Sequence, residues 1–430
     1  MLAAGLGAGA LLAAARLPGG RAARAGVGVG VRPRPHLPEG VDTIPQIEHV
    51  IVVMMENHSF DNYLGVLGRG DGLPVDRHGN PVAVNADATG RPVRSFRMPG
   101  FTQLPHEPSN GWNASHIAMN GRRNDGFARA SGPVAMGYYT PADLPFYAGL
   151  ARTFVLADRW FASVPAKTFP NRYFLLSGTA NGLVTQTLPP QDPTNGSIMD
   201  VMDAHGISWL DYYSDLPSTD LFRSVLRSGK SKQVPVAQFF TDAAAGSLPF
   251  FSLVEPNFGT SSEEDPQDVR VGEQFASQVV NAVLHGPGWA KSLLVWCYDE
   301  SGGYYDHVPP PAAPVPDSVP PNIHVPPDAP GGYDRYGIRV PAAVVSPRAR
   351  KGHVSSVVYD HTSILRFIET KWNLPALTNR DGHAANLLDC LDLHAPPAFL
   401  TPPRLPAPSL TVNSAPCAPI SPSSIPPVSL

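Results

Sequence analysis

The chain has 430 residues, of which 43% are hydrophobic, enough for a large buried core in one big domain or two ordinary ones. Lys and Arg number 32 and Asp and Glu 36, so the formal net charge of -4 gives no overall electrostatic case for nucleic-acid binding. The three cysteines are widely spaced, which excludes a disulfide framework.

The two ends of the chain differ in composition from its middle. Residues 1–15 are small and apolar and resemble the hydrophobic part of an export signal, although the basic stretch that normally precedes it is missing. The alternative is a plain Ala/Gly-rich leader. We take residues 1–40 as leader and linker and expect an exported or cell-envelope protein. Residues 395–430 are rich in proline and serine, which predicts a disordered tail.

The middle of the chain, residues 41–394, has the composition of a globular domain. Short apolar runs, too short and continuous for amphipathic helices, predict buried strands at residues 49–55, 250–254, 292–298 and 340–345. Helices are predicted at residues 170–177, 268–284 and 359–372. Strands that alternate with helices predict an α/β fold with a mostly parallel central sheet flanked by helices.

Polar side chains follow two of these predicted strands at the point where each strand ends. Glu56 and Asn57 follow the first strand, and Asp299 and Glu300 follow the third. Ligands of open α/β sheets bind just beyond the carboxyl ends of strands. Three carboxylates and an amide oxygen suit one divalent ion, Ca²⁺, Mg²⁺ or Mn²⁺, better than Zn²⁺. Either pair alone would more often cap a helix or face solvent, so the prediction depends on their joint occurrence.

Thr168 comes two residues before the start of the predicted helix at residues 170–177. Its hydroxyl would lie at a helix N-terminus, where free N–H groups and the helix dipole favour an anion such as phosphate. Next to a metal ion, that hydroxyl could act as a nucleophile. From position alone, a simple N-cap role is the more frequent one.

The string EHVIVVMMENHSFDNY at residues 48–63 resembles the opening of the phosphoesterase family of bacterial-type phospholipases C and related acid phosphatases, a branch of the alkaline-phosphatase-like superfamily. The likeness continues in order over nearly the whole globular part, at His116 and at residues 125–127, 167–172, 246–249, 298–310, 339–341, 346–347 and 359–364. The resemblance implies an alkaline-phosphatase-like fold and a phosphoesterase catalytic domain over residues 41–394.

The resemblance also implies roles for single residues. Glu56, Asn57, Asp299 and Glu300 match the metal ligands of the family. Thr168 matches the nucleophile, which also touches the metal and passes through a covalent phospho-enzyme.

Several histidines fall in the matched motifs. His116 or His106 is implied to contact the phosphate or a proton in transfer, and His307 likewise. Asp360 and His361 lie in a further motif of the family. As an alternative, His307 and His361 would be structural, hydrogen-bonded to the backbone beneath the site.

Two positions depart from the family pattern. Where many members carry a histidine, which serves as the acid for the leaving group, the chain has Asp265, or Glu264 in a shifted register. Asp265 could protonate a leaving group only if its pKa were raised. Met119 stands where phospholipase-like members have a tryptophan, so other aromatic residues would have to form a wall for a choline head group. The candidates are Trp112, Trp209, Tyr212 and Tyr213.

Three functions are compatible with these residues. The leading hypothesis is a metal-dependent hydrolase of the phospholipase C type, which acts on a phospholipid and makes transient contact with a membrane surface. The second is an acid phosphatase for small soluble monoesters, which uses the same core residues. The third, motivated by Asp265, is a catalytically silent binding protein of the same fold. The residues indicate no oligomeric state.

Overall fold

The computed structural model describes residues 28–103, 108–228 and 230–410. The apolar stretch at residues 1–15, the candidate His106 and the last part of the predicted tail lie outside these ranges. In the described part of the chain, no helix has both the length and the apolar character needed to cross a lipid bilayer.

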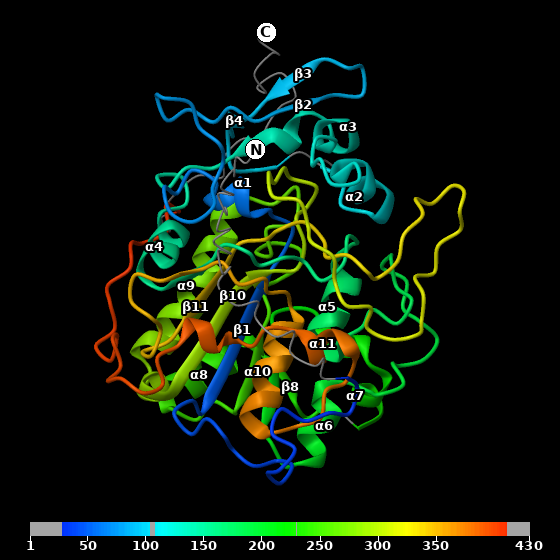
Figure 1. Ribbon diagram of the computed structural model, residues 1–430. Coiled ribbons are helices and arrows are strands. Elements are labelled where there is room, and N and C mark those ends of the chain that lie inside the picture. The colour runs from blue at the N-terminus through cyan, green and yellow to red at the C-terminus, as the bar shows by residue number, and fades with distance from the viewer. Residues whose placement is uncertain (1–27, 104–107, 229, 411–430) are drawn as a thin grey trace, which may run out of the picture.

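An eight-stranded sheet forms the centre of the molecule, in the order β12-β6-β11-β10-β1-β9-β7-β8 (Figure 1). The strands from β10 to β8 in this order are parallel, whereas β11 runs antiparallel to both of its neighbours. The strands are β1 (His49–Met55), β6 (Val155–Ala157), β7 (Trp209–Tyr213), β8 (Gln233–Pro235), β9 (Phe251–Val254), β10 (Ser292–Tyr298), β11 (Ala342–Val345) and β12 (Val354–Ser355).

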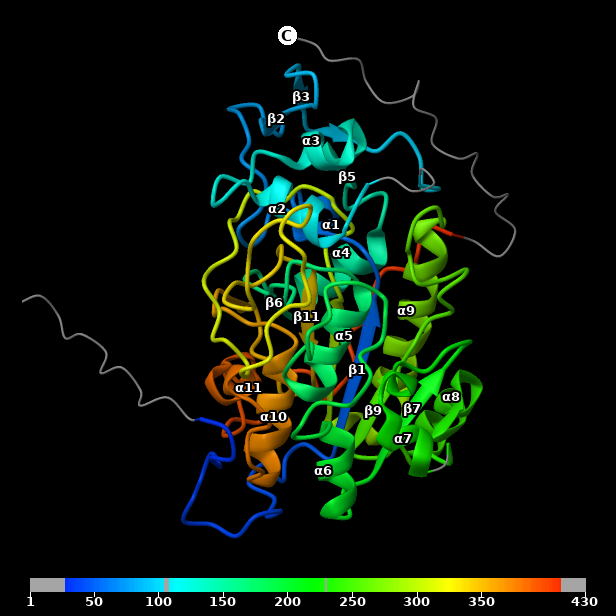
Figure 2. The same cartoon turned by 90° about the vertical axis from the view of Figure 1, so that its right-hand side faces the viewer.

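Helices lie on both sides of this sheet, with α9 on one side and α5 and α10 on the other (Figure 2). The α-helices are α1 (Phe60–Leu64), α2 (Trp112–Met119), α3 (Phe127–Ser131), α4 (Pro145–Thr153), α5 (Thr168–Ser177), α6 (Ile198–Ala204), α7 (Arg223–Ser228), α8 (Val236–Ala245), α9 (Val269–His285), α10 (Thr362–Trp372) and α11 (Asn379–His383). Short 3₁₀ helices are η1 (Pro133–Met136), η2 (Ser218–Leu221), η3 (Pro287–Lys291) and η4 (Leu387–Cys390).

Two small sheets, with α2 and α3, lie beyond the carboxyl ends of β1 and β10 (Figure 1). One sheet pairs β2 (Val84–Ala86) with β3 (Pro92–Arg94), and the other pairs β4 (Phe96–Arg97) with β5 (Gly137–Tyr138). This part of the molecule therefore covers the edge of the main sheet at which ligands are expected.

The predicted α/β fold is confirmed. β1 and β10 have the predicted bounds because their apolar runs are buried on both faces, as in the middle of a parallel sheet. The predicted strand at residues 340–345 is present as β11, but its antiparallel direction makes the sheet mixed. The three predicted helices correspond to α5, α9 and α10.

The first part of the proline-rich tail packs against the globular body. The Phe399 ring lies 4.9 Å from that of Phe154, and the Trp289 indole donates a hydrogen bond to the Phe399 carbonyl. Further on, the Ser409 hydroxyl donates to the Asp143 carbonyl. The prediction of disorder from residue 395 onward is therefore wrong for residues 395–410, because buried aromatic contacts hold this segment.

Candidate active site

The two predicted ligand pairs leave the sheet side by side. β1 and β10 are parallel neighbours, and their register places Met55 opposite Tyr298. Glu56 and Asn57 therefore emerge beside Asp299 and Glu300 at one edge of the sheet, and all four residues are buried. The backbone N–H of Asn57 donates a hydrogen bond of 3.2 Å to Asp299 Oδ1, which joins the two pairs directly.

The backbone at this edge is tightly packed. Asn57 has a φ of 70°, a left-handed conformation that asparagine tolerates better than most residues. A Cβ on Gly302 would lie only 2.0 Å from the Asn57 carbonyl oxygen. Glycine is therefore required there for the loop after Glu300 to approach the loop after Glu56.

Thr168 is the first residue of α5 and is buried next to these carboxylates. The N-cap of α5 is Lys167, so Thr168 lies within the first turn instead of capping it. Burial raises the pKa of Asp299, and a hydrogen bond with the Thr168 side chain is among the interactions that oppose this rise. The hydroxyl thus lies both at a helix N-terminus and beside a candidate metal ligand.

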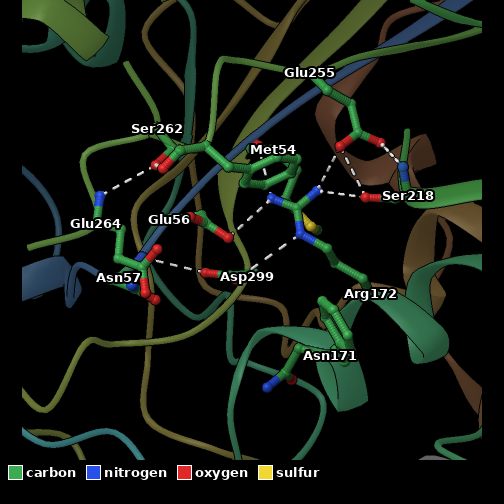
Figure 3. Close-up of polar contacts among 12 residues, drawn as sticks. Met54, Glu56, Asn57, Asn171, Arg172, Ser218, Glu255, Ser262, Glu264 and Asp299 are labelled. Carbon is green, nitrogen blue, oxygen red and sulfur yellow. Dashed lines mark hydrogen bonds and ion pairs between the residues drawn. The ribbon is translucent and has the colours of Figure 1, made fainter. Parts of the chain in front are cut away.

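Arg172, one turn further along α5, lies between two groups of acidic side chains (Figure 3). Its guanidinium nitrogens are 3.7 Å from Glu56, 4.0 Å from Asp299 and 3.2 Å from Glu255. The side chain is fully buried and also donates to the Ser218 hydroxyl. A buried cation in this place stabilises the ionised form of the neighbouring carboxylates.

Arg172 was predicted only as part of a matched motif, not as a site residue. The available signal was its spacing: on a helix, a residue four positions after Thr168 lies on the same face. Glu255, its partner at 3.2 Å, follows β9 directly, but a single glutamate after a strand carries little information in the sequence.

Three oxygens of the site lack hydrogen-bond partners among the described residues: Glu56 Oε2, Asn57 Oδ1 and Asp299 Oδ2. Buried polar atoms in native proteins are nearly always paired, and unpaired ones are costly. These oxygens come from the two residue pairs that meet at the sheet edge, and they are the hard ligands that a divalent ion prefers. The residues present therefore fit a metal ion of this kind.

Glu300 differs from the other three candidates because both of its carboxylate oxygens accept hydrogen bonds. Its Oε1 accepts a 2.5 Å hydrogen bond from the Asn110 side chain, and its Oε2 accepts one of 2.7 Å from the Gly302 amide. Burial, and then the charge of Asp299, raise the pKa of both Glu56 and Glu300 well above that of an ordinary carboxyl group. A bound cation would reverse this effect and keep the carboxylates ionised.

His361 lies directly beneath the site. Its Nε2 is 2.7 Å from the Asp299 carbonyl oxygen, and the Trp160 indole donates to its Nδ1. Burial lowers the pKa of His361 to about 4, so the ring is neutral at physiological pH. A neutral ring hydrogen-bonded to the backbone corresponds to the alternative in which His361 is structural. The neighbouring Asp360 accepts hydrogen bonds from the Thr362 and Ser163 hydroxyls and lies 3.8 Å from the Arg380 guanidinium.

The other two described histidine candidates make separate contacts. His116, on α2, bonds through Nδ1 to the Trp112 carbonyl, and its ring lies 4.3 Å from the Trp112 ring. His307 Nδ1 lies 2.7 Å from Asp61, and its Nε2 lies 3.1 Å from Asp71. Neither ring is brought beside Thr168 by a contact among the described residues.

A second acidic group consists of Asp61, Asp306 and His307, whose ligand atoms lie within 4.8 Å of one another. By geometry alone it could hold a metal ion. Arg339 already lies 3.1 Å from each of the two carboxylates. Arg339 thus already balances the charge of both carboxylates.

A cavity of about 310 Å³ opens beside Thr168. Glu56, Thr168 and Arg172 line its inner end. Apolar side chains form most of the remaining wall, namely Phe169, Leu188, Leu216, Pro217, Leu221 and Phe258. The cavity thus combines a polar end with an apolar wall, which is typical of ligand sites.

Glu264, and not Asp265, is on the wall of this cavity in the described structure. Asp265 lies toward Tyr304, whose pKa is raised by burial and then by the charge of Asp265. The aromatic residues considered for a choline wall are also elsewhere: Trp112 donates to the Ala329 carbonyl, Trp209 to Asp203 and Tyr212 to Asp242. The aromatic rings on the cavity wall are instead those of Phe169 and Phe258.

Comparison with known proteins identifies the class. A model of the phosphoesterase family matches residues 47–375. The chain is 30% identical over 420 residues to non-specific phospholipase C1 of Arabidopsis thaliana, covering 88% of this chain and 76% of that protein. It is 30% identical over 429 residues to phospholipase C A of Mycobacterium tuberculosis, covering 86% and 80%.

The chain belongs to the phosphoesterase family, and it is a phosphoric ester hydrolase. The resemblance noted in the sequence is thereby confirmed. Among solved structures, the chain is similar to a protein in the alkaline phosphatase superfamily from Vibrio parahaemolyticus, with 10% identity and a TM-score of 0.43 over 82% of this chain and 72% of that one. This structural likeness is too distant to bear on function.

Proposed function

We propose that the protein is a hydrolase of the phospholipase C type that uses one divalent metal ion and Thr168 as its nucleophile. The observation that carries the proposal is the set of buried oxygens on Glu56, Asn57 and Asp299, unpartnered among the described residues, beside the start of α5. With Glu300, these residues would hold Ca²⁺, Mn²⁺ or Mg²⁺. When bound, the ion would neutralise the carboxylates and polarise a phosphoryl oxygen.

Thr168 makes the new bond in this proposal. Its Oγ releases its proton to water and attacks the phosphorus, the bond from phosphorus to the lipid alcohol oxygen breaks, and the alcohol takes up a proton and leaves; a phosphodiester of Thr168 that still carries the head group is formed. Water then attacks this phosphodiester, the bond from phosphorus to Thr168 Oγ breaks, one proton of the water restores the hydroxyl, and the phosphorylated head group is released. The free N–H groups at the start of α5 favour the negative charge of the phosphoryl group throughout.

Two further side chains support this chemistry. Arg172 holds Glu56 and Asp299 in orientation, and its charge favours their ionised forms and so opposes the rise in pKa that burial causes. Glu264, on the cavity wall, takes the place that the sequence first assigned to Asp265 and supplies the proton to the departing alcohol. Burial raises the pKa of Glu264, which makes it a better proton donor near neutral pH.

The apolar cavity wall favours a phospholipid over a small soluble monoester. An ester bound at Thr168 places its organic group against Phe169, Leu221 and Phe258, where an apolar group is stabilised by removal from water. Acid phosphatase activity toward small monoesters is the second candidate, because the same polar residues would serve it.

The test compares hydrolysis of phosphatidylcholine with that of a chromogenic aryl phosphate, with chelator and with added Ca²⁺ or Mn²⁺. Chelator-sensitive cleavage of the lipid supports the proposal, whereas turnover of the aryl phosphate alone supports an acid phosphatase. A Thr168→Ala variant that keeps its fold and loses all turnover excludes the binding-protein hypothesis. A Thr168→Ser variant, which keeps a hydroxyl, is the matched control.

We also infer export and transient contact with a membrane surface, from the apolar stretch at residues 1–15 and from the lipid substrate proposed above. Mass spectrometry of the N-terminus of the protein recovered from the culture medium or envelope would test export. Recovery only inside the cell, with residues 1–15 intact, would contradict it.

A further inference from the structure

A buried carboxyl group next to the site has three tyrosine partners. Glu263 is fully buried, and its Oε2 accepts hydrogen bonds of 2.7 Å from the Tyr63 hydroxyl and 2.5 Å from the Tyr298 hydroxyl. Its Oε1 accepts one of 2.6 Å from Tyr147. Burial raises the pKa of Glu263 to about 8. The described contacts thus satisfy both oxygens of a group that is costly to bury.

The three tyrosines come from three separate elements of the fold. Tyr298 is the last residue of β10 and directly precedes the candidate ligand Asp299. Tyr63 is on α1, which follows the Glu56 loop, and Tyr147 is on α4. One carboxyl group therefore connects the end of β10 with α1, which follows the Glu56 loop, and with α4.

The backbone around Glu263 makes the same connection. The Ser262 carbonyl accepts a hydrogen bond of 3.0 Å from the Glu56 amide, and the Glu263 carbonyl lies 3.2 Å from His58 Nε2. The next residue, Glu264, is on the wall of the cavity. Residues 262–264 thus touch the Glu56 loop on one side and the cavity on the other.

The local conformation of Glu263 is one that few side chains adopt. Its φ is 79°, in the left-handed region that disfavours residues other than glycine. Space for the side chain is provided by Gly272 on α9, where a Cβ would lie 2.1 Å from Glu263 Cγ. Such a conformation persists only where surrounding contacts hold it in place, here the tyrosine hydroxyls.

We propose that Glu263 is a positioning residue of the active site, because its carboxyl group holds residues 262–264 against the ends of β1 and β10. Through this contact it sets the position of the Glu56 loop and of Glu264. This inference rests on the proposed function, since it assigns Glu263 to the same metal-dependent site.

The test uses the full chain with Glu263→Gln and Tyr147→Phe. The glutamine keeps the size of the side chain but replaces one acceptor oxygen by an NH₂ donor, which cannot accept from a tyrosine hydroxyl. The measurements are thermal unfolding, Mn²⁺ binding by calorimetry, and kcat and KM for a chromogenic aryl phosphate well below the unfolding temperature. We expect Glu263→Gln to weaken Mn²⁺ binding or lower kcat by about 10- to 100-fold, as for residues that support metal ligands. Tyr147→Phe should act in the same direction with a smaller effect.

A matched control is Glu369→Gln. Glu369 is also fully buried, and burial raises its pKa well above that of an ordinary carboxyl group, but its ion-pair partner is Arg366 on the same helix, α10. This variant should lower the unfolding temperature and leave Mn²⁺ affinity and kcat unchanged.

The outcomes separate the two proposals. Wild-type protein that neither binds Mn²⁺ nor hydrolyses the ester contradicts the proposed function itself. Active wild type together with Glu263→Gln of equal Mn²⁺ affinity and kcat overturns the positioning role. If Glu263→Gln does not fold, Tyr147→Phe decides alone: a lower kcat or Mn²⁺ affinity supports the role, and unchanged values overturn it.

Discussion

Two buried acidic groups follow β1 and β10, and they differ in how their charges are balanced. In the first, Glu56 Oε2 and Asp299 Oδ2 have no hydrogen-bond partner among the described residues, and the Arg172 guanidinium lies 3.7 Å from Glu56 Oε1 and 4.0 Å from Asp299 Oδ2. In the second, Asp61 and Asp306 each lie 3.1 Å from Arg339. The number of carboxylates does not separate these two groups; they differ in that the first has several buried oxygens without hydrogen-bond partners close together, whereas an arginine pairs with both carboxylates of the second.

The largest expected effect tests the first group. Glu56→Gln removes one carboxylate from the candidate metal site while keeping its shape, so Mn²⁺ binding and turnover should fall by about a hundred-fold or more. Calorimetry and aryl phosphate hydrolysis measure the two quantities. Glu39→Gln, at an exposed glutamate, is the control and should match wild type. Retained Mn²⁺ affinity in Glu56→Gln would contradict the assignment of this residue as a ligand.

The next effect tests the second group. Arg339→Leu leaves Asp61 and Asp306 buried without their cation, and breaking such a pair typically lowers the free energy of unfolding by about 3–5 kcal/mol. Denaturant unfolding measures the change, and Arg350→Leu, at an exposed arginine, should stay within about 0.5 kcal/mol of wild type. If Arg339→Leu instead unfolds like wild type but loses Mn²⁺ binding, the two groups have been assigned the wrong way round.

A smaller effect comes from the pH dependence of the second group. Burial alone would lower the pKa of His307, but the hydrogen bond and charge of Asp61 outweigh it, so the net pKa is raised. Because the pKa of His307 is higher in the folded protein than in the unfolded chain, protonation of this ring stabilises the fold at pH values below about 6.5, the pKa in the unfolded chain. This stabilisation is lost as the pH rises through the pKa of His307 in the folded protein. The difference in free energy of unfolding between wild type and His307→Gln should therefore shrink from pH 6 to pH 9. A constant or growing difference would show that the His307 contact does not depend on protonation.

The smallest effect concerns the apolar wall of the cavity. Leu216 is 63% exposed at the cavity, so Leu216→Gln should leave the fold and the turnover of a small aryl phosphate unchanged. Loss of an apolar contact equivalent to about one buried CH₂ group, about 0.8 kcal/mol, corresponds to a fall of about 4-fold in kcat/KM for a short-chain phosphatidylcholine. Leu226→Gln, at an exposed leucine of α7, is the control. Equal losses on both substrates would exclude a selective role for Leu216.

Local sequence was sufficient for the elements that depend on neighbours along the chain. The bounds of β1 and β10 could be predicted because both runs are apolar without interruption. Since parallel strands end at the same edge of a sheet, the meeting of Glu56 with Asp299 was predictable as well. The motif around Thr168 placed that residue at the start of a helix, where it lies.

Contacts between distant segments were beyond what the sequence pattern could predict. The pairing of His307 with Asp61 and Asp71, and that of Arg172 with Glu255, join residues from separate loops and strands. Disorder of the whole tail was predicted from composition, yet Phe399 finds an aromatic partner in the folded protein. Composition indicates how much apolar surface a segment can bury by itself, but it does not indicate which apolar side chains of other segments will pack against it.

The sequence by itself determined the α/β class, the two strands that carry the candidate ligands, the position of Thr168 and the family, because each depends on local pattern or motif. Only the tertiary structure decided that Glu264 and not Asp265 faces the cavity. Glu263 has a left-handed backbone conformation, and this sets where the side chains of Glu264 and Asp265 lie. The three tyrosines that hold the Glu263 carboxyl group come from three separate elements. Such a conformation depends on contacts across the fold, which no spacing along the chain encodes.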